Sequence, residues 1–325
     1  MPSRRSLLSY VLGPAAFSAG LAAASRASAR TAPEFVGIDS WLNTDGPLTL
    51  AGLRGNVVLL EFCTYTCINW RRTLPYVNRW AAEYGPQGLR MIGVHTPEFG
   101  FERIRPNVET ALSELGVTYP IAQDNAYRTW RAWGNRAWPS FYLLDRNGEI
   151  RLVREGEGHA QEIETAIRGL LGLSRAGSGR DGTDDADLSR IFTPEIYFGS
   201  LHDTRQARTQ SPRTGDAVYA ITDPSGPGLN EYDLDGRWAR GEEGLVLRSA
   251  TGRVRLRFSA AKLHLVAGAP QSTPVRVSVD RGPPRTGKIG LPTMYTLLDG
   301  DRYGEHVLEL ACETPGLSLY SATFG

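Results

Sequence analysis

The feature that most constrains this chain of 325 residues is an apolar run that leads into the start of a helix bearing a cysteine. Residues 56–62 form the continuous apolar run, which is typical of a buried strand. A helix is predicted from about residue 67 to residue 84, where apolar side chains recur at three- and four-residue steps. Cys67 stands where this helix begins. Unpaired N–H groups and the positive end of the helix dipole favour a thiolate at such a position, so we expect a lowered thiol pKa.

The elements that follow predict an α/β domain over residues 31–173. A second strand at 89–95 makes a right-handed parallel unit with the first strand and the helix, so both strands end at the same edge of the sheet. Asn147-Gly148 between two apolar runs predicts a hairpin. The remaining predicted elements are helices at 106–115, 126–133 and 160–171 and strands at 118–122, 141–145 and 149–154.

The second half of the chain has a different pattern. Residues 174–190 are rich in Gly, Ser and Asp and predict a flexible linker. From residue 191 to residue 325, short β-type runs alternate with Gly and Pro clusters, which predicts an all-β sandwich of the jelly-roll type. The predicted strands lie at 218–221, 244–248, 253–258, 263–266, 275–279, 307–310 and 317–324.

The first 29 residues have the pattern of an export signal. Arg4 and Arg5 precede an apolar stretch from residue 7 to residue 24, and Ala27-Ser28-Ala29 supplies a cleavage pattern of small residues. The paired arginines fit a twin-arginine signal, and a general secretory signal is the alternative. Either signal predicts a protein of the periplasm, the cell envelope or the extracellular space, where disulfides are permitted.

Charge and cysteine content exclude several classes of function. The formal net charge of +1 gives no basic field for nucleic acid. Three cysteines are too few for a disulfide scaffold. We expect Cys312, at a strand end in the second half, to be buried and unpaired. The sequence predicts no cofactor and no metal site.

Residues 32–172 resemble the TlpA-like branch of the thioredoxin superfamily, close to the exported thioredoxin-like part of DipZ proteins. Four features carry the resemblance in the right order: Glu61 at the buried carboxylate, Cys67 at the attacking cysteine, Pro75 at the proline of the helix, and Trp138-Pro139-Ser140 at the cis-proline loop. The segments 193–199 and 320–325 resemble the module that follows this domain in DipZ proteins, which looks like carbohydrate-binding domains in outline. The resemblance implies a thioredoxin-like fold, thiol or disulfide partners and a second domain that could bind a glycan.

One departure from the family concerns the second cysteine of its motif. The Cys-x-x-Cys motif reads Cys67-Ile68-Asn69-Trp70 here, so the resolving cysteine is replaced by Trp70. Cys63 stands where many relatives have tryptophan. The thiol and the aromatic ring have in effect exchanged places.

Four interpretations of the cysteines stay open. In the first, Cys63 and Cys67 form a dithiol: four residues apart, they would lie about 6 Å apart in a helical turn, within disulfide range, and about 13 Å apart if extended. In the second, Cys67 is a single reactive thiol, with Arg71 and Arg72 adding positive potential. The third is a thiol peroxidase, because Thr64-x-x-Cys67 matches the peroxiredoxin core. In the fourth, Cys67 is inert and the domain is only a binding scaffold.

Other residues near Cys67 have two interpretations each. Glu61 would be a buried carboxyl that relays a proton, or a carboxylate paired with an arginine. His95, at the end of the second strand, would lie near the thiolate or bond a loop. Pro139 in cis would let nearby backbone groups pair with a substrate peptide. Trp70 and Trp138 would line an apolar groove or pack in the core.

The second domain offers two candidate ligand surfaces. Arg253, Arg255 and Arg257 alternate along one strand, so they predict either a site for an anionic glycan or partner, or a solvated face. Six aromatic residues could stack on sugar rings or form the core: Tyr197, Tyr219, Tyr232, Trp238, Tyr295 and Tyr303. The combined prediction is an exported thiol–disulfide protein that acts through Cys67, with Cys63 or an external thiol as resolver. The alternative from another class is a redox-inactive binding protein.

Overall fold

The computed structural model describes residues 30–174, 188–202 and 205–325. The predicted export signal and most of the predicted linker lie outside the described residues. Among the helices that are described, none is both long enough and apolar enough to cross a membrane.

The first domain is built on a seven-stranded mixed sheet. The central strand β3 (Val57–Cys63) is buried at every residue and pairs in parallel with β4 (Leu89–His95). The strand order is β1-β7-β6-β3-β4-β5-β2, and β6 runs antiparallel to β3. The other strands are β1 (Arg30–Thr31), β2 (Ser40–Leu42), β5 (Ile121–Gln123), β6 (Ser140–Leu144) and β7 (Glu149–Glu155).

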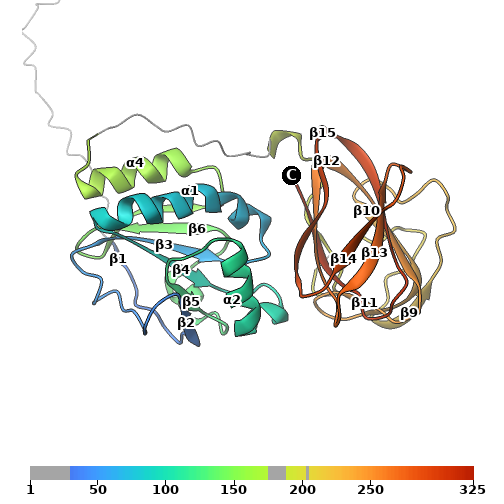
Figure 1. Cartoon of the computed structure of the whole chain (residues 1–325), viewed down its shortest axis with the longest axis horizontal. Coiled ribbons are helices and arrows are strands. Elements are labelled where there is room, and N and C mark those ends of the chain that lie inside the picture. Colours follow the sequence, from blue (N-terminus) through green and yellow to red (C-terminus); the bar gives the residue numbers. More distant parts are fainter. Residues whose placement is uncertain (1–29, 175–187, 203–204) are drawn as a thin grey trace, which may run out of the picture.

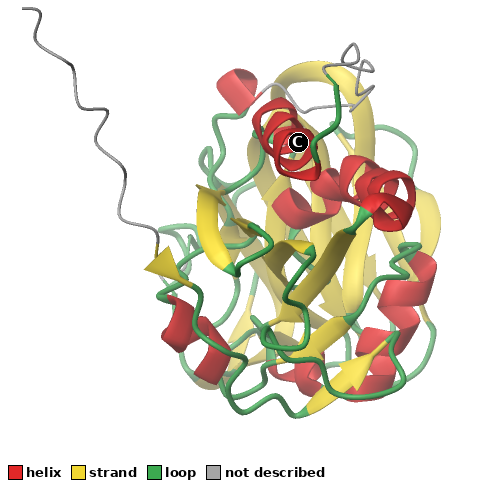
Figure 2. Ribbon diagram, turned by 90° about the vertical axis from the view of Figure 1, so that its left-hand side faces the viewer, coloured by secondary structure: helices red, strands yellow, loops and turns green. Residues whose placement is uncertain are grey.

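Helices pack around this sheet (Figure 2). An apolar core lies on each of its two faces. On one side, α1 (Ile68–Tyr84) and α4 (Ala160–Leu171) bury Trp80, Ile163 and Ile167 in a common core. α2 (Arg105–Glu114) contributes Val108 to the same core, whereas α3 (Arg128–Trp133) buries Trp133 on the other side. Short 3₁₀ helices η1 (Gly85–Gln87) and η2 (Gly100–Arg103) lie between these elements. The predicted thioredoxin-like α/β fold is confirmed, and Pro75 lies inside α1 as expected.

The second domain is β-rich and follows η3 (Leu188–Arg190). Its strands pair along the path β14-β13-β15-β12-β10-β11-β16-β8, with β9 added on β10. This pairing order does not establish the jelly-roll arrangement, which stays a prediction. The strands are β8 (Ile196–Tyr197), β9 (Gly215–Tyr219), β10 (Glu231–Arg240), β11 (Leu245–Leu247), β12 (Gly252–Gly268), β13 (Thr273–Val279), β14 (Arg285–Ile289), β15 (Thr293–Cys312) and β16 (Ser318–Phe324).

The second domain differs from the sequence prediction in several strands: β8 and β14 were not predicted, and β15 is far longer than the predicted run 307–310. The runs 253–258 and 263–266 are parts of one strand, β12, which continues through a bulge between Ala260 and Lys262. Strand β10 was missed, because its alternation of apolar residues is broken at Gly236. This glycine has φ of +101°, and a Cβ there would lie 2.7 Å from the carbonyl oxygen of Thr251, so only glycine fits without strain.

The two domains lie side by side and touch through polar and apolar contacts (Figure 1). The Tyr65 hydroxyl donates to the carbonyl of Pro292 at 3.1 Å, and Arg72 donates to the carbonyl of Phe324 at 2.8 Å. The rings of Phe101 and Tyr320 lie 4.7 Å apart between their centroids. The second domain therefore packs against the edge of the first domain where β3 gives way to α1.

Candidate active site

Cys67 occupies the residue before the first turn of α1, as its sequence position predicts. Its backbone is extended, and its carbonyl accepts the N–H of Arg71 at 3.0 Å, which starts the helix. The thiol points at the loop before β6, where Sγ donates to the carbonyl of Trp138 at 3.8 Å. The bond between Trp138 and Pro139 is cis, and Cys67 itself is half-buried. The thiol thus faces the cis-proline loop, as the resemblance implies.

The prediction of a lowered thiol pKa at Cys67 is wrong for this arrangement of domains. Burial raises the pKa of Cys67 well above its ordinary value. The backbone N–H groups of Asn69 and Trp70 lower the pKa, as the helix start predicts, but the carboxyl groups of Glu98 and Glu195 raise it. The helix effect is present and is outweighed by loss of solvent and by negative charge that the sequence analysis did not anticipate.

Glu61 lies in the core beneath the helix start and is held by two donors. The indole N–H of Trp70 donates to its Oε1 at 3.1 Å, and the Tyr119 hydroxyl donates to the same atom at 2.5 Å. Burial raises the pKa of Glu61 to about 7, against the opposing effect of both donors. Its Oε2 has no hydrogen-bond partner among the described residues. Trp70 has no exposed surface, so this ring packs in the core and binds the carboxyl group instead of facing the groove.

Cys63 ends β3 and has no exposed surface. A Cβ at Gly93, on the neighbouring strand, would lie 2.4 Å from Cδ1 of Ile121, so the glycine leaves room for this side chain, and it would lie at an ordinary contact distance of 3.4 Å from Sγ of Cys63. Burial raises the pKa of Cys63 well above its ordinary value, and the charge of Glu61 adds to the effect. In the part of the chain that the structure describes, all three cysteines are free, and Cys312 is buried as expected.

His95 and Trp138 differ in burial and in contacts. His95 is fully buried, stacks on Tyr65 with 5.8 Å between ring centroids, and has no described partner for either ring nitrogen. Burial lowers the pKa of His95 to about 3, so its ring is neutral at physiological pH. Trp138 is half-buried and packs against Trp130, 4.6 Å away between centroids. Of the two tryptophans, only Trp138 keeps surface at the groove.

The arginines after Cys67 bind the backbone and the second domain. Arg71 donates to the carbonyl of Tyr65 at 2.7 Å and to Oγ1 of Thr293 at 3.0 Å. Arg72 pairs with Glu157 at 3.0 Å in addition to its bond to the second domain. Both arginines therefore take part in the contact between the two domains.

Sequence reasoning missed the acidic residues around Cys67. Glu102 is buried and accepts the Thr66 hydroxyl at 2.7 Å and the backbone N–H of Glu98 at 2.6 Å, which ties the helix start to the loop after β4. Glu98 in turn accepts the Tyr197 hydroxyl of the second domain at 2.6 Å. A sequence signal existed, because Thr96-Pro97-Glu98 and Thr193-Pro194-Glu195 repeat one triplet in the two domains.

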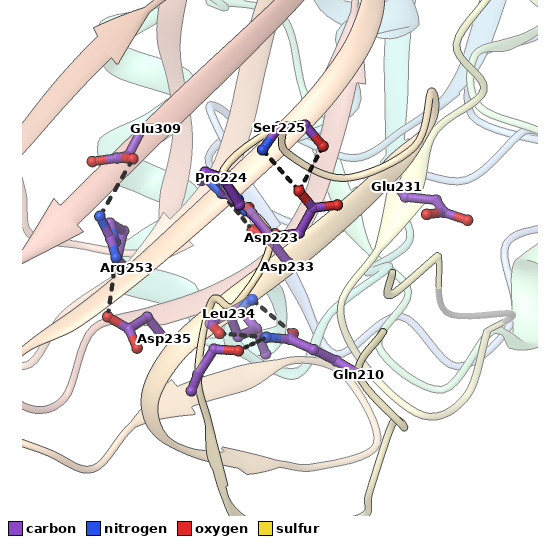
Figure 3. A network of polar contacts seen from close by, with 12 residues as sticks. Gln210, Asp223, Pro224, Ser225, Glu231, Asp233, Leu234, Asp235, Arg253 and Glu309 are labelled. Atoms are coloured by element: carbon purple, nitrogen blue, oxygen red, sulfur yellow. Dashed lines mark hydrogen bonds and ion pairs between the residues drawn. The ribbon is translucent and has the colours of Figure 1, made fainter. Parts of the chain in front are cut away.

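The arginine row of the second domain is neutralised by carboxylates. Arg253 lies between Asp235 at 3.3 Å and Glu309 at 3.7 Å (Figure 3). Arg255 forms a buried pair with Asp233 at 2.5 Å, and Arg257 reaches Glu305 at 2.7 Å. A free cationic face for an anionic ligand is therefore not present along this row.

Most of the aromatic residues considered for sugar stacking have other contacts. Tyr219, Tyr232 and Trp238 are buried in the core of the second domain. Tyr197 lies at the contact between the domains, and the Tyr295 hydroxyl donates to the carbonyl of Leu291 at 2.7 Å. Core packing accounts for three of the six residues.

Comparison with known proteins supports both halves of this description. The AhpC/TSA family matches residues 29–153, and the family described as thioredoxin-like C-terminal domain matches residues 193–325. Protein DipZ of Mycobacterium tuberculosis is 37% identical over 311 residues, covering 93% of this chain and 44% of that protein. The chain thus spans less than half of the length of this relative.

A second relative matches the first domain alone. Thiol-disulfide oxidoreductase YkuV of Bacillus subtilis is 26% identical over 140 residues, which cover 43% of this chain and 93% of that protein. Together with the fold and with a thiol that faces a cis-proline loop, these similarities support a DipZ/TlpA-like protein of the thioredoxin superfamily.

Proposed function

We propose that this chain is an exported protein that exchanges disulfides through the single thiol of Cys67. The observation that carries the proposal is the position of this thiol: half-buried at the start of α1, with Sγ directed at the carbonyl before Pro139. The leader residues and the thiol–disulfide relatives support action in the periplasm, the envelope or the extracellular space.

The proposed reaction has two exchange steps. The Cys67 thiolate attacks one sulfur of a substrate disulfide, a Cys67–substrate disulfide forms, and the other substrate sulfur leaves as a thiolate that takes a proton. An external thiolate then attacks the mixed disulfide and releases Cys67 as a thiolate. The protein ends in its starting redox state, so the net result is transfer of a disulfide between external thiols.

An external thiol is the better candidate for the resolving step. Cys63 has no exposed surface, and its Sγ lies against Gly93 on the neighbouring strand. An attack by Cys63 requires the loop between β3 and α1 to rearrange. Release of a mixed disulfide by added thiol should therefore be equally fast in wild type and in Cys63→Ser, and slower release in the variant would identify Cys63 as the resolver.

The proposal is tested by incubating the reduced protein with 2-hydroxyethyl disulfide and mapping adducts by peptide mass spectrometry. We expect an adduct at Cys67 that is absent in Cys67→Ser, while Cys312, which is buried, stays unmodified in both. Absence of the Cys67 adduct under conditions in which free cysteine reacts would refute the exchange function.

A redox-inactive binding protein is the second candidate, and the raised pKa of Cys67 favours it. The same experiment separates the two, because a scaffold protein gives no adduct. The peroxidase alternative has less support, since a peroxidatic cysteine must be a thiolate at neutral pH. For the second domain we retain the jelly-roll arrangement as a proposal, and no observation on the described residues favours a glycan ligand.

A further inference from the structure

A buried carboxyl group that the exchange steps do not use joins the turn before α1 to the loop after β4. Glu102 of η2 has no exposed surface. Its Oε1 accepts the backbone N–H of Thr66 at 3.2 Å and the Thr66 hydroxyl at 2.7 Å. Its Oε2 accepts the backbone N–H of Glu98 at 2.6 Å and that of Phe99 at 3.0 Å. Both oxygens of Glu102 are therefore used to hold together two segments that are distant in the chain.

The residue that Glu102 holds stands directly before the thiol. Thr66 ends the turn between β3 and α1, and Cys67 follows it. A side chain at the residue before the first turn commonly holds the start of a helix. In the part of the chain that the structure describes, Cys67 makes no such bond, and the first turn of α1 has no acidic residue. Arg71 holds the carbonyl of Tyr65 from within the helix, and Glu102 is the anchor from outside it.

The loop that carries Glu102 is itself held by the second domain. The backbone N–H of Gly100 donates to Oε2 of Glu243 at 2.9 Å. The ring of Phe101 packs against the ring of Tyr320, with 4.7 Å between the centroids. Glu102 thus holds the turn from a segment that is packed between the two domains.

The direction of the Cys67 thiol depends on the backbone before it. The contact from Sγ to the carbonyl of Trp138 is 3.8 Å long, and a thiol is a weak donor, so this contact alone does not fix the side chain. Exchange requires the attacking sulfur to be aligned with the disulfide that it breaks, and a misplacement of about 1 Å can cost about a hundredfold in rate.

We propose that Glu102 is a positioning residue for the exchange at Cys67, which holds Thr66 and thereby keeps the thiol directed at the cis-proline loop. The inference rests on the proposed exchange function and adds to it a residue that acts through Thr66. A carboxylate has only acceptors, which suits the four donors around Glu102, whereas a glutamine would turn its own N–H groups toward some of them.

The test compares two reactions of Cys67 in the full, reduced chain. Exchange with 2-hydroxyethyl disulfide depends on the direction of the thiol, whereas alkylation by iodoacetamide measures its access and ionisation. Both rates are followed at Cys67 by peptide mass spectrometry, under conditions in which denaturant unfolding shows that each variant is folded. The ratio of the exchange rate to the alkylation rate measures the positioning.

The variants act on the contact between Thr66 and Glu102. Thr66→Val removes the hydroxyl donor with little change in size, and Thr66→Ser keeps it. We expect the ratio to fall about tenfold in Glu102→Gln, by about threefold or more in Thr66→Val and by less than about twofold in Thr66→Ser. In the double variant of Thr66→Val with Glu102→Gln the ratio should be no lower than in Glu102→Gln, because both changes break the same contact.

Glu164→Gln is the matched control for a general loss of stability. Glu164 accepts the Tyr84 hydroxyl at 2.5 Å and pairs with Arg79 at 2.9 Å, at a distance along α1 from the thiol. Its replacement should lower the free energy of unfolding and keep the wild-type ratio. A loss of the ratio in this control as large as that in Glu102→Gln would overturn the inference.

The remaining outcomes separate positioning from the exchange function. Equal ratios in wild type, Glu102→Gln and Thr66→Val overturn the positioning role and leave the exchange function intact; they include the case in which both rates fall together. Losses that add up in the double variant also contradict it. If Glu102→Gln does not fold, Thr66→Val and Thr66→Ser decide, because equal ratios in these two refute the role of the hydroxyl contact. Absence of a Cys67 adduct in wild type refutes the exchange function itself.

Discussion

Restoring a second cysteine at residue 70 should convert the site into a dithiol at a cost in stability. Trp70 has no exposed surface and donates to Glu61 at 3.1 Å. Replacing a buried tryptophan by a small residue costs about 3–5 kcal/mol, mainly through the cavity left behind. The reduced Trp70→Cys variant should lose about this much free energy of unfolding.

Oxidation should recover part of the loss. A disulfide between residues 67 and 70 closes a loop of about four residues, which stabilises the folded state by about 2 kcal/mol on the chain-entropy estimate. The oxidised variant should therefore lie about 1–3 kcal/mol below wild type. Denaturant unfolding of the reduced and oxidised forms measures both values, and thiol titration counts the cysteines lost on oxidation.

Trp80→Cys is the matched control, because Trp80 is fully buried in the same helix, ten residues further along. It should lose a similar free energy when reduced and recover none on oxidation. Two results would refute this reasoning. One is a Trp70→Cys variant in which the thiols at residues 67 and 70 stay free under oxidant. The other is a reduced variant that is as stable as wild type.

Two further predictions follow from the buried acid and the thiol. The pKa of Glu61 is about 7 in the folded protein against 4.5 as the ordinary value, so its stabilising effect is complete below pH 4.5 and is lost as the pH rises through 7. Between pH 4.5 and pH 8, the contribution of Glu61 to the free energy of unfolding should fall by up to about 3 kcal/mol in wild type and should be absent in Glu61→Gln. Denaturant unfolding of both proteins across this pH range measures the difference. If the free energy of unfolding depends on pH in the same way in both proteins, the raised pKa of Glu61 is contradicted. Because the pKa of Cys67 is raised, its alkylation by iodoacetamide should still accelerate between pH 8 and pH 9.5, and a plateau by pH 8 would show an acidic thiol.

The first domain was predictable because its signals are local. The run before Cys63 and the apolar spacing of α1 gave the elements, and β4 and α4 have the predicted bounds. The thiol's orientation toward Trp138 also followed, since the strand-to-helix turn and the proline loop are fixed by short stretches of chain. Burial of Trp70 against Glu61 was not predictable, because it depends on a tryptophan side chain that lies where relatives have a thiol.

The second domain was less predictable because long strands can continue through bulges. Strand β12 changes partner along its length: Arg253 to Arg257 pair with β10, and Leu263 to Gly268 pair with β16. Periodicity on either side of the bulge looks like two short strands. Charge patterning along Arg253 and Arg255 could not be interpreted without the acidic residues on the neighbouring strands.

The pKa of Cys67 shows why the two domains have to be considered as one site. Within the first domain alone, the N–H groups of Asn69 and Trp70 lower the pKa of the thiol. Burial outweighs this effect and raises the pKa of the thiol, and the carboxyl groups of Glu98 in the first domain and Glu195 in the second domain raise it further. A thiol with a raised pKa is protected from indiscriminate reaction, because the thiolate is the reactive form. The second domain thus contributes to this protection through the charge of Glu195.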